Sequence, residues 1–296
     1  MPRALVTGAG GFIGARLVRR LLGEGWTVDL ITRPSTLIAD DLSAAAIHSF
    51  DGTTAGLVAV MEVVRPDVVF HLASLYLAEH APADLEPLIA SNVLLTAQLA
   101  EAMTVTLPTG SARLVATGTA WQHYRGPGYV PVNLYAATKQ AGDDLLRYYS
   151  DARHLSSITL KLFDTFGQGD TRRKLVQLLV DAASSGQRLG MSPGDQIIDI
   201  SHVDDVVDAF IVASRRLLTA SNPLDESYFV SGERLRVRDL VPVVERAMGR
   251  RLDVVFGERP YRDREVMEPV SPAQGQILPG WIPRRRLIEM LPTLGA

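Results

Sequence analysis

The sequence predicts an α/β protein with a doubly wound parallel sheet and a smaller C-terminal cap. Two observations carry this prediction. Three glycines at positions 8, 11 and 14, spaced G-x-x-G-x-x-G, stand between a short apolar run, Ala4 to Val6, and a helical pattern. After them, short β-branched runs alternate with longer helical stretches as far as residue 165, which is typical of right-handed βαβ units.

The glycine turn is suited to hold the pyrophosphate of a dinucleotide. A residue without Cβ permits the tight turn and lets the backbone approach the phosphates, and the next helix offers free N–H groups and a partial positive charge. Because the turn from Gly8 to Gly14 directly follows a predicted strand, its context is that of a dinucleotide-binding motif. The sheet is therefore expected to be of the Rossmann type.

The other elements of the first 165 residues follow from the same patterns. We expect strands at Ala4–Val6, Thr27–Thr32, Ala46–Phe50, Val68–Leu72, Arg113–Thr117 and Ser157–Leu162. We expect helices at 12–23, 53–65, 84–104 and 133–153. Ligands bind beyond the carboxyl ends of strands in such sheets, so polar residues just after a strand are candidates for the site.

The regular alternation ends after Phe163. Turn residues dominate 164–201 around one helix near 172–185, and the later expected elements are a helix at 203–219, a strand at Tyr228–Val230, a helix at Arg236–Met248, a strand at Leu252–Phe256 and a short helix near 285–291. We expect a dinucleotide-binding domain of residues 1–165 and 202–232. Residues 166–201 and 233–296 would form a substrate domain, a substrate-binding cap packed on the first.

Composition excludes several classes of function. Of the 296 residues, 47% are hydrophobic and 21% are charged, and the net charge of −3 does not suit nucleic acid as a partner. The chain has no cysteine, so it has no disulfide or thiolate metal site, and no metal is expected. We expect no signal peptide before the first strand, and no apolar stretch that approaches the ~20 residues needed to span a bilayer. We expect a cytoplasmic protein without a membrane partner.

The end of the second strand bears on the choice of cofactor. A dinucleotide fold usually has an acid there, which binds the adenosine ribose. Here Thr32 ends the strand and Arg33 follows, and a guanidinium can bind a 2′-phosphate that an acid would repel. We therefore expect NADP(H) and regard NAD(H) as the alternative, in which Arg33 is a solvated loop residue and Asp29 reaches the ribose. Asp51, after the third strand, either contacts the adenine or caps a turn.

A tyrosine and a lysine four residues apart are the candidate catalytic pair. Tyr135 and Lys139 lie one turn apart on one face of the predicted helix. A phenol with a pKa of about 10 is a poor acid near neutrality, and a nearby ammonium would lower that pKa. Thr119, just after the fifth strand, would hydrogen-bond a substrate oxygen. Thr117 is the competing hydroxyl, although it is also the expected last residue of the strand.

The segment after Thr119 is expected to form a loop over the site with four side chains: Trp121, Gln122, His123 and Tyr124. The imidazole of His123 is suited to acid–base chemistry, but a single histidine in a polar loop also fits a substrate contact or a surface residue. The basic run 172–174 opens the expected cap and is a candidate for binding phosphates, whereas basic runs are also common on solvated faces.

In combination, these residues resemble the extended short-chain dehydrogenase/reductase family, which acts on nucleotide sugars. The resemblance rests on the three glycines, Thr119 and Tyr135-x-x-x-Lys139. Further stretches agree with it along the whole chain: Phe70-His71-Leu72-Ala73, Asn92, Leu162–Gly167, Asp199–Val206 and Pro279–Pro283. By family resemblance, the helices at 84–104 and 133–153 would form the face of a homodimer.

The resemblance assigns contacts to named residues. Those expected to contact the cofactor are Gly8, Gly11, Phe12, Ile13, Gly14, Thr32, Arg33, Asp51, Leu72, Ala73, Asn92, Thr117, Tyr135, Lys139 and Phe163. Those expected to contact the substrate are Thr119, Trp121, Gln122, His123, Asp164, Thr165, Lys174 and Arg259. Two positions depart from the family pattern: Ile198 stands where an arginine usually binds the substrate diphosphate, and Asp164 stands where an asparagine is usual. Gln196 or an arginine of 258–262 would replace the missing arginine.

The loop after the fifth strand narrows the activity that the resemblance implies. Nucleotide-sugar 4,6-dehydratases carry Thr-Asp-Glu where this chain has Thr117-Gly118-Thr119, so dehydration is not expected. Residues 117–124 and 131–141 resemble 4-ketoreductases of the CDP-abequose and CDP-paratose synthase type. The resemblance implies NADPH-dependent reduction of the C4 ketone of a nucleotide-linked 4-keto-deoxyhexose, with Tyr135 as proton donor and Lys139 on the nicotinamide ribose. The alternatives are a nucleotide-sugar 4-epimerase and a non-catalytic NADP(H)-binding protein.

Overall fold

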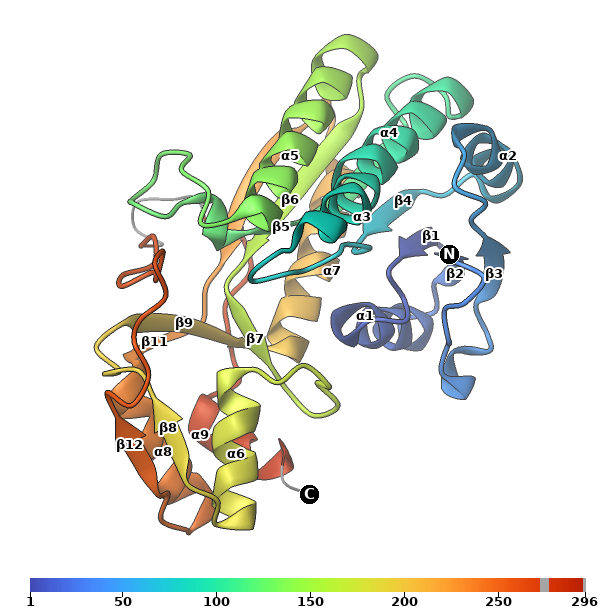
Figure 1. Cartoon of the computed structure of the whole chain (residues 1–296). Helices are drawn as coiled ribbons and strands as arrows, with labels where there is room; N and C mark the ends of the chain where they lie inside the picture. The colour runs from blue at the N-terminus through green and yellow to red at the C-terminus, as the bar shows by residue number, and fades with distance from the viewer. Residues whose placement is uncertain (272–276, 295–296) are drawn as a thin grey trace.

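A seven-stranded parallel sheet forms the centre of the molecule (Figure 1). The computed structural model describes residues 1–271 and 277–294, and within these ranges the strand order is β10-β6-β5-β4-β1-β2-β3. The strands are β1 (Arg3–Thr7), β2 (Thr27–Thr32), β3 (Ala46–Ser49), β4 (Val68–His71), β5 (Arg113–Thr119), β6 (Ser156–Leu162) and β10 (Asp225–Val230). The strand order reverses between β1 and β4, and ligands of such sheets bind at this reversal. The predicted fold class is confirmed.

Helices cover both faces of the sheet. On one face α1 (Phe12–Gly23) packs beside α7 (Val203–Thr219), and on the other α2 (Thr54–Val64), α4 (Leu95–Thr106) and α5 (Leu134–Arg153) lie side by side. Two separate apolar clusters fill the space beneath these layers. The near-continuous apolar strands, with Phe70 and Leu5 fully buried, are explained by this cover on both faces.

One helical segment differs from its prediction. The expected helix at 84–104 is a 3₁₀ turn (Pro82–Asp84), α3 (Leu85–Ile89), a π-helical turn (Ala90–Leu94) and α4 in succession. Taken together, Pro82–Thr106 contains an 18-residue window with a mean hydropathy of 1.4, so by length and composition alone the segment could cross a membrane, which corrects the expectation that no stretch approaches that length. Half of its apolar window is buried inside the fold, where α4 packs between α2 and α5.

The cap contains short strands that the sequence did not predict. These are β7 (Asp164–Phe166), β8 (Leu189–Met191), β9 (Ile197–His202) and β11 (Glu233–Arg236). β9 lies between β7 and β11 in one small sheet, and β8 pairs with β12 (Val254–Phe256) in another. The cap helices are α6 (Leu175–Ser185), α8 (Val237–Met248) and α9 (Leu287–Met290), and they share their own apolar cluster. Residues 272–276 and 295–296 of the expected substrate domain lie outside the described residues.

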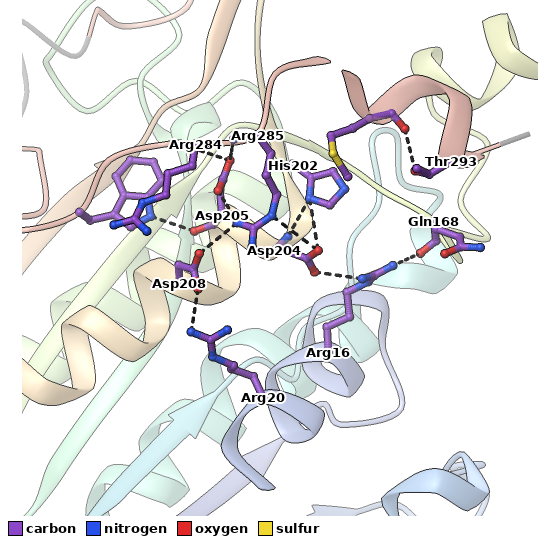
Figure 2. Close-up of polar contacts among 12 residues, drawn as sticks. Arg16, Arg20, Gln168, His202, Asp204, Asp205, Asp208, Arg284, Arg285 and Thr293 are labelled. Atoms are coloured by element: carbon purple, nitrogen blue, oxygen red, sulfur yellow. Dashed lines mark hydrogen bonds and ion pairs between the residues drawn. The ribbon is translucent and has the colours of Figure 1, made fainter. Parts of the chain in front are cut away.

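An ion-pair network fastens the C-terminal segment to the main sheet layer (Figure 2). The buried carboxylate of Asp205 accepts hydrogen bonds from the backbone N–H groups of Arg284 (3.2 Å) and Arg285 (3.0 Å). The Arg285 guanidinium lies 2.5 Å from Asp205 and 3.0 Å from Asp208. The backbone carbonyl of Asp205 accepts from the indole N–H of Trp281 at 2.8 Å. The segment from Trp281 to Arg285, which precedes the cap helix α9, is therefore anchored on α7.

Candidate active site

The glycine turn between β1 and α1 has no space for side chains. Gly8 has a φ of +79°, and a Cβ there would lie 2.6 Å from the backbone nitrogen of Ala73. A Cβ on Gly14 would lie 2.1 Å from the carbonyl oxygen of Gly8. In the part of the chain that the structure describes, no side chain caps the first turn of α1. Its free N–H groups and the close backbone approach of Leu72 and Ala73 fit a dinucleotide pyrophosphate.

The start of α1 is covered from the cap side. The Arg172 guanidinium lies 5.1 Å from the centre of the Phe12 ring, and Arg16 lies 5.8 Å from it. Asp170 holds Arg172 through two hydrogen bonds of 2.7 and 2.8 Å. Arg172, the first residue of the basic run 172–174, is therefore held over the start of α1, beside the glycine turn that is expected to bind the cofactor.

The end of β2 presents an arginine to solvent. Thr32 is buried and its carbonyl accepts from the backbone of Phe50, whereas Arg33 is exposed. Within residues 1–271 and 277–294, the Arg33 side chain has no ion-pair or hydrogen-bond partner. Asp29 is buried in ion pairs with Arg3 and His48, both at 2.8 Å, so its carboxylate is already engaged. The alternative in which Asp29 binds the ribose is therefore not supported.

Asp51 has one of its two expected roles. It lies after β3 and accepts hydrogen bonds from the backbone N–H and the hydroxyl of Thr53, each at 2.8 Å. Thr53 in turn caps α2. These contacts are those of a turn aspartate, and they hold the loop beside the expected adenine position.

Tyr135 and Lys139 are both buried on the first two turns of α5. Asn133 caps this helix by accepting from the backbone N–H of Ala136 at 3.0 Å, which fixes where the helix begins. Thr119 ends β5, two residues later than expected, and its hydroxyl accepts from the Trp121 N–H at 3.2 Å. Thr117 lies earlier in the strand and donates to the carbonyl of His71.

Burial is the largest cause of the pKa shifts of Tyr135 and Lys139. It raises the pKa of the Tyr135 phenol, with the Tyr76 phenol as the next cause, while the Ser74 hydroxyl and the Arg172 charge act in the opposite direction. Burial lowers the pKa of Lys139 to about 8. The expected lowering of the Tyr135 pKa by Lys139 is therefore not found. A phenol in this state keeps its proton near neutral pH and can donate it.

His71 is a neutral partner of this site. Burial and the positive charge of Lys139 lower its pKa to about 3. Its two ring nitrogens lie 2.9 Å from the Thr7 hydroxyl and 3.0 Å from the Thr96 hydroxyl. It therefore joins the ends of β1 and β4 to α4 without adding a charge beneath the cradle.

The structure places Gln122 and His123 differently from the expectation of substrate contacts. Gln122 is fully buried: its Oε1 accepts from the Thr119 N–H, and its Nε2 donates to Gln140 and Asp143. His123 Nδ1 lies 2.9 Å from the carbonyl of Pro127, and its Nε2 lies 2.9 Å from Lys161 Nζ. The ammonium must donate to Nε2, so Nδ1 carries the hydrogen and the ring is neutral. Both side chains fasten the loop from beneath.

Asn92 also has a different position from a cofactor contact. Its Oδ1 accepts from the Ser74 hydroxyl and the Leu75 N–H, and its Nδ2 donates to the Leu75 carbonyl and the Thr138 hydroxyl. All of the hydrogen-bonding capacity of the amide is used. The π-helical turn carries Asn92 into this position, and its amide joins the loop after β4 to α5.

The expected substrate residues line the boundary with the cap. A cavity of about 30 Å³ lies between Asp164, Lys174, Gln177 and Ile198, and Thr165 lies in its wall. Asp164 Oδ1 is 3.2 Å from Lys174 Nζ, so the lysine offsets the acid that replaces the usual asparagine. Phe163 packs at 5.7 Å on Phe229 of β10.

Arg259 and Gln196 do not take the position of the arginine that Ile198 replaces. Arg259 is exposed, and its backbone N–H donates to Met191 of β8. Gln196 is buried and donates to Ser192. The charge of Arg262 opposes the rise that burial causes in the pKa of Tyr76, whereas Arg259 has no such effect on that phenol.

Sequence reasoning missed Tyr76. Its ring lies 5.1 Å from that of Tyr135 and 5.8 Å from that of Trp121, so it joins the candidate catalytic helix to the substrate loop. It lies outside every motif, in an irregular segment after β4. The only signal in the sequence was its place shortly after Phe70-His71-Leu72-Ala73.

Comparison with known proteins shows which family the chain is similar to. A profile of the NAD dependent epimerase/dehydratase family matches residues 4–223. CDP-abequose synthase of Yersinia pseudotuberculosis is 27% identical over 270 residues, 90% of this chain and 91% of that protein. UDP-glucose 4-epimerase of Mycolicibacterium smegmatis is 32% identical over 231 residues, 71% of this chain and 72% of that protein. The solved structure of MoeE5 with UDP-glucuronic acid and NAD has a TM-score of 0.81 and 25% identity, covering 98% of this chain and 97% of its own.

Proposed function

The chain belongs to the NAD dependent epimerase/dehydratase family, and its relatives include the nucleotide-sugar enzymes CDP-abequose synthase and UDP-glucose 4-epimerase. On this premise we propose that it is an NADPH-dependent 4-ketoreductase. Its substrate is a nucleotide-linked 4-keto-deoxyhexose, which it reduces at C4. The observation that carries the proposal is the buried Tyr135 phenol, which burial keeps protonated. Reduction of a ketone needs a proton donor at the oxygen.

The residues of the chain divide the work of this reaction. Gly8, Gly11 and Gly14 hold the pyrophosphate, with Leu72 and Ala73 packed behind them, and Lys139 holds the nicotinamide ribose. When bound, the nicotinamide supplies the hydride that reaches C4. Tyr135 Oη donates its proton to the C4 oxygen, and the Thr119 hydroxyl hydrogen-bonds the same oxygen.

Reduction of the ketone is favoured over dehydration and over a non-catalytic role. The sequence Thr117-Gly118-Thr119 at the end of β5 carries no acid, so the paired carboxyls of a dehydratase are missing there. The similarity to CDP-abequose synthases extends over about nine-tenths of the chain. Tyr135 and Lys139 are both present and buried, which weighs against a non-catalytic NADP(H)-binding protein. The second candidate is a 4-epimerase, favoured by the 32% identity with the mycobacterial UDP-glucose 4-epimerase.

The nucleotide sugar is proposed to lie between the carboxyl ends of the main-sheet strands and the cap, which is formed by residues 166–201 and 233–296. The Asp164–Lys174 pair lies at this boundary, and Trp121 packs near Tyr76, whose ring the Lys174 ammonium approaches. Arg262, in place of Arg259, is the proposed diphosphate ligand. Its guanidinium is mostly exposed and 3.8 Å from Glu265. A weakly paired arginine is free to bind an anion.

We further propose that the protein is a cytoplasmic homodimer. The helical segment from α3 to α4 exposes Leu85, Ile89, Leu94 and Val105, and α5 packs beside α4. An exposed apolar row of this kind is suited to an interface. Sedimentation velocity would distinguish the dimer from the 32.2 kDa monomer.

A substrate panel tests the proposed activity. NADPH and NADH oxidation would be followed with 4-keto-6-deoxyglucose linked to CDP, dTDP, UDP and GDP, and each product identified by NMR. We expect net NADPH oxidation and a new alcohol at C4. Isomerisation of a nucleotide sugar without net oxidation of NADPH would identify a 4-epimerase instead.

Replacing Arg33 with aspartate is expected to reverse the cofactor preference. The carboxylate would repel the 2′-phosphate, so the KM for NADPH should rise about 10- to 100-fold while the KM for NADH falls or stays unchanged, as expected for loss of a charge-assisted contact. The control is Arg65→Asp, the same charge change at an exposed residue before the start of β4, whereas Arg33 follows the carboxyl end of β2. Equal effects of the two substitutions would contradict the assignment of Arg33.

The pH profile of kcat tests the protonation of Tyr135. The phenol acts as an acid, so turnover is lost as the pH rises through its pKa. Because burial raises that pKa, the loss of kcat that belongs to the phenol should come only near or above the ordinary phenol value of about 10. A separate change near the Lys139 pKa of about 8, where the lysine loses its charge, belongs to Lys139 and not to Tyr135. A loss centred near pH 7 would contradict this assignment.

A further inference from the structure

Tyr76 lies between the candidate catalytic helix and the substrate loop. Its ring meets that of Tyr135 edge to face, with centroids 5.1 Å apart and planes at 81°, and it lies 5.8 Å from Trp121. The side chain is nevertheless 41% exposed. One side of Tyr76 therefore covers Tyr135, while another part of its surface is open beside the expected substrate position.

Two asparagines hold the loop that carries Tyr76. On one side, Asn92 bonds the Ser74 hydroxyl and both backbone groups of Leu75. On the other, Asn133 Nδ2 donates to the backbone carbonyls of residues 77 and 78, at 3.2 and 2.9 Å. Because the loop is held on both sides of Tyr76, it is pre-organised, and the direction of the Tyr76 side chain is fixed.

Both asparagines also contact α5. Asn92 donates to the Thr138 hydroxyl at 3.0 Å, and Asn133 is the N-cap of the helix. The loop is thus joined to the helix that carries Tyr135 and Lys139. The position of Tyr76 relative to Tyr135 is fixed by this scaffold and does not depend on the cap.

The cap contributes charges around Tyr76. The Lys174 ammonium lies 5.7 Å from the centre of its ring, and Asp164 lies 3.2 Å from that ammonium. Burial and the Asp164 charge raise the pKa of Tyr76 to about 12, against the effect of Arg262 and Arg172. Its phenol therefore stays neutral near neutral pH, and its ring remains an uncharged surface at the boundary between sheet and cap.

We propose that Tyr76, together with Trp121, is the aromatic wall on which the sugar ring packs, and that it selects a 6-deoxy sugar. This inference rests on the proposed function. A methyl group at C6 gains from burial against the two rings, whereas a hydroxyl there would lose its water contacts. An apolar wall discriminates against one added hydroxyl by about 10²-fold at most. Tyr76 is therefore a specificity-determining residue as well as the cover of Tyr135.

The test compares Tyr76→Ala and Tyr76→Phe with the wild type. Oxidation by NADP⁺ of dTDP-6-deoxyglucose and dTDP-glucose, or of the CDP pair if the panel selects CDP, gives the ratio of the two kcat/KM values. Loss of the ring in Tyr76→Ala should raise the KM of the 6-deoxy substrate about 10-fold or more and bring the ratio close to one. Tyr76→Phe keeps the wall and should retain the ratio within about threefold. NADPH affinity should be unchanged in both.

Phe256→Ala is the matched control. Phe256 of β12 is 39% exposed and lies 6.0 Å from the Arg238 guanidinium, so it is a similarly exposed aromatic ring beside a cation, on the far side of the cap (Figure 1). Its loss should leave the ratio unchanged. The pH profile is a second readout, because uncovering Tyr135 should move the alkaline loss of kcat to lower pH in Tyr76→Ala only.

The outcomes separate this inference from the proposed function. An unchanged ratio in Tyr76→Ala, or an equal change in Phe256→Ala, would overturn the inference while the reductase activity stands. If the wild type reduces no 4-keto sugar, calorimetric binding of dTDP-6-deoxyglucose and dTDP-glucose replaces kinetics. A preference for the 6-deoxy ligand that Tyr76→Ala abolishes would then support the aromatic wall although the proposed function fails, and no preference would overturn both.

Discussion

Replacing Tyr135 with phenylalanine is expected to lower kcat about 10³-fold and to leave the affinity for NADPH within about threefold of the wild type. The substitution removes the one proton that the proposed reaction takes from the chain, and general acid catalysis contributes about 10²- to 10⁴-fold. The ring remains, so its edge-to-face contact with Tyr76 is preserved. Stopped-flow single turnovers with saturating NADPH would measure the chemical step directly.

Tyr149→Phe is the matched control for this prediction. Tyr149 is buried on the same helix, and its hydroxyl donates to Glu101 Oε2 at 2.8 Å, away from the site. Its loss should cost about 1 kcal/mol of stability and leave turnover unchanged. Near-normal turnover in Tyr135→Phe, or a loss in Tyr149→Phe of similar size, would refute the role of Tyr135.

The sequence was most informative where a pattern repeats over many residues. The helix of Tyr135 and Lys139 extends over 20 residues with a clear apolar face, and β1 and β4 are continuous apolar runs. Both patterns follow from burial in a layered α/β fold. The spacing of the glycines identified Gly8 and Gly14 in the sequence. The structure requires glycine at both positions, because the backbone there leaves no space for a Cβ.

The cap strands were missed because their pairing is not local. β7 and β8 have three residues each, too few to show an alternating pattern, and β9 pairs with β11 over thirty residues away. β9 itself contains the buried Asp199, whose carboxylate accepts from Ser231 and from the Gly232 N–H. Such contacts decide the fold of the segment but leave no periodic signal in the sequence.

The direction of individual side chains was also beyond sequence reasoning. Gln122 and His123 come directly after Trp121, yet they turn toward Asp143 and Lys161 beneath the loop. In an irregular segment, no fixed period relates neighbouring side chains to one face. Tyr76 escaped notice for the same reason, since its place beside Tyr135 depends on the two asparagines that hold its loop.

Removing the guanidinium in Arg285→Ala is expected to lower the free energy of unfolding by about 3 kcal/mol. Asp205 is 1% exposed, and the guanidinium at 2.5 Å is the cation nearest to its carboxylate among the described residues (Figure 2). Breaking a buried ion pair on one side leaves an uncompensated buried charge, which costs about 3–5 kcal/mol. We expect the lower end of that range because Arg285 is partly exposed and two backbone N–H groups still bind the carboxylate.

The control is its neighbour in Arg286→Ala. Arg286 is mostly exposed and lies 3.4 Å from Glu233, and a surface pair of this kind contributes about 0–1 kcal/mol. Urea unfolding followed by tryptophan fluorescence suits the comparison, because Trp281, one of the three tryptophans, donates its indole N–H to the carbonyl of Asp205, so part of the signal comes from the same anchor. Equal losses in the two variants would show that the stability comes from surface charge. A loss confined to Arg285→Ala would show that the buried carboxylate of α7 holds the C-terminal segment, and with it α9 of the cap, in place.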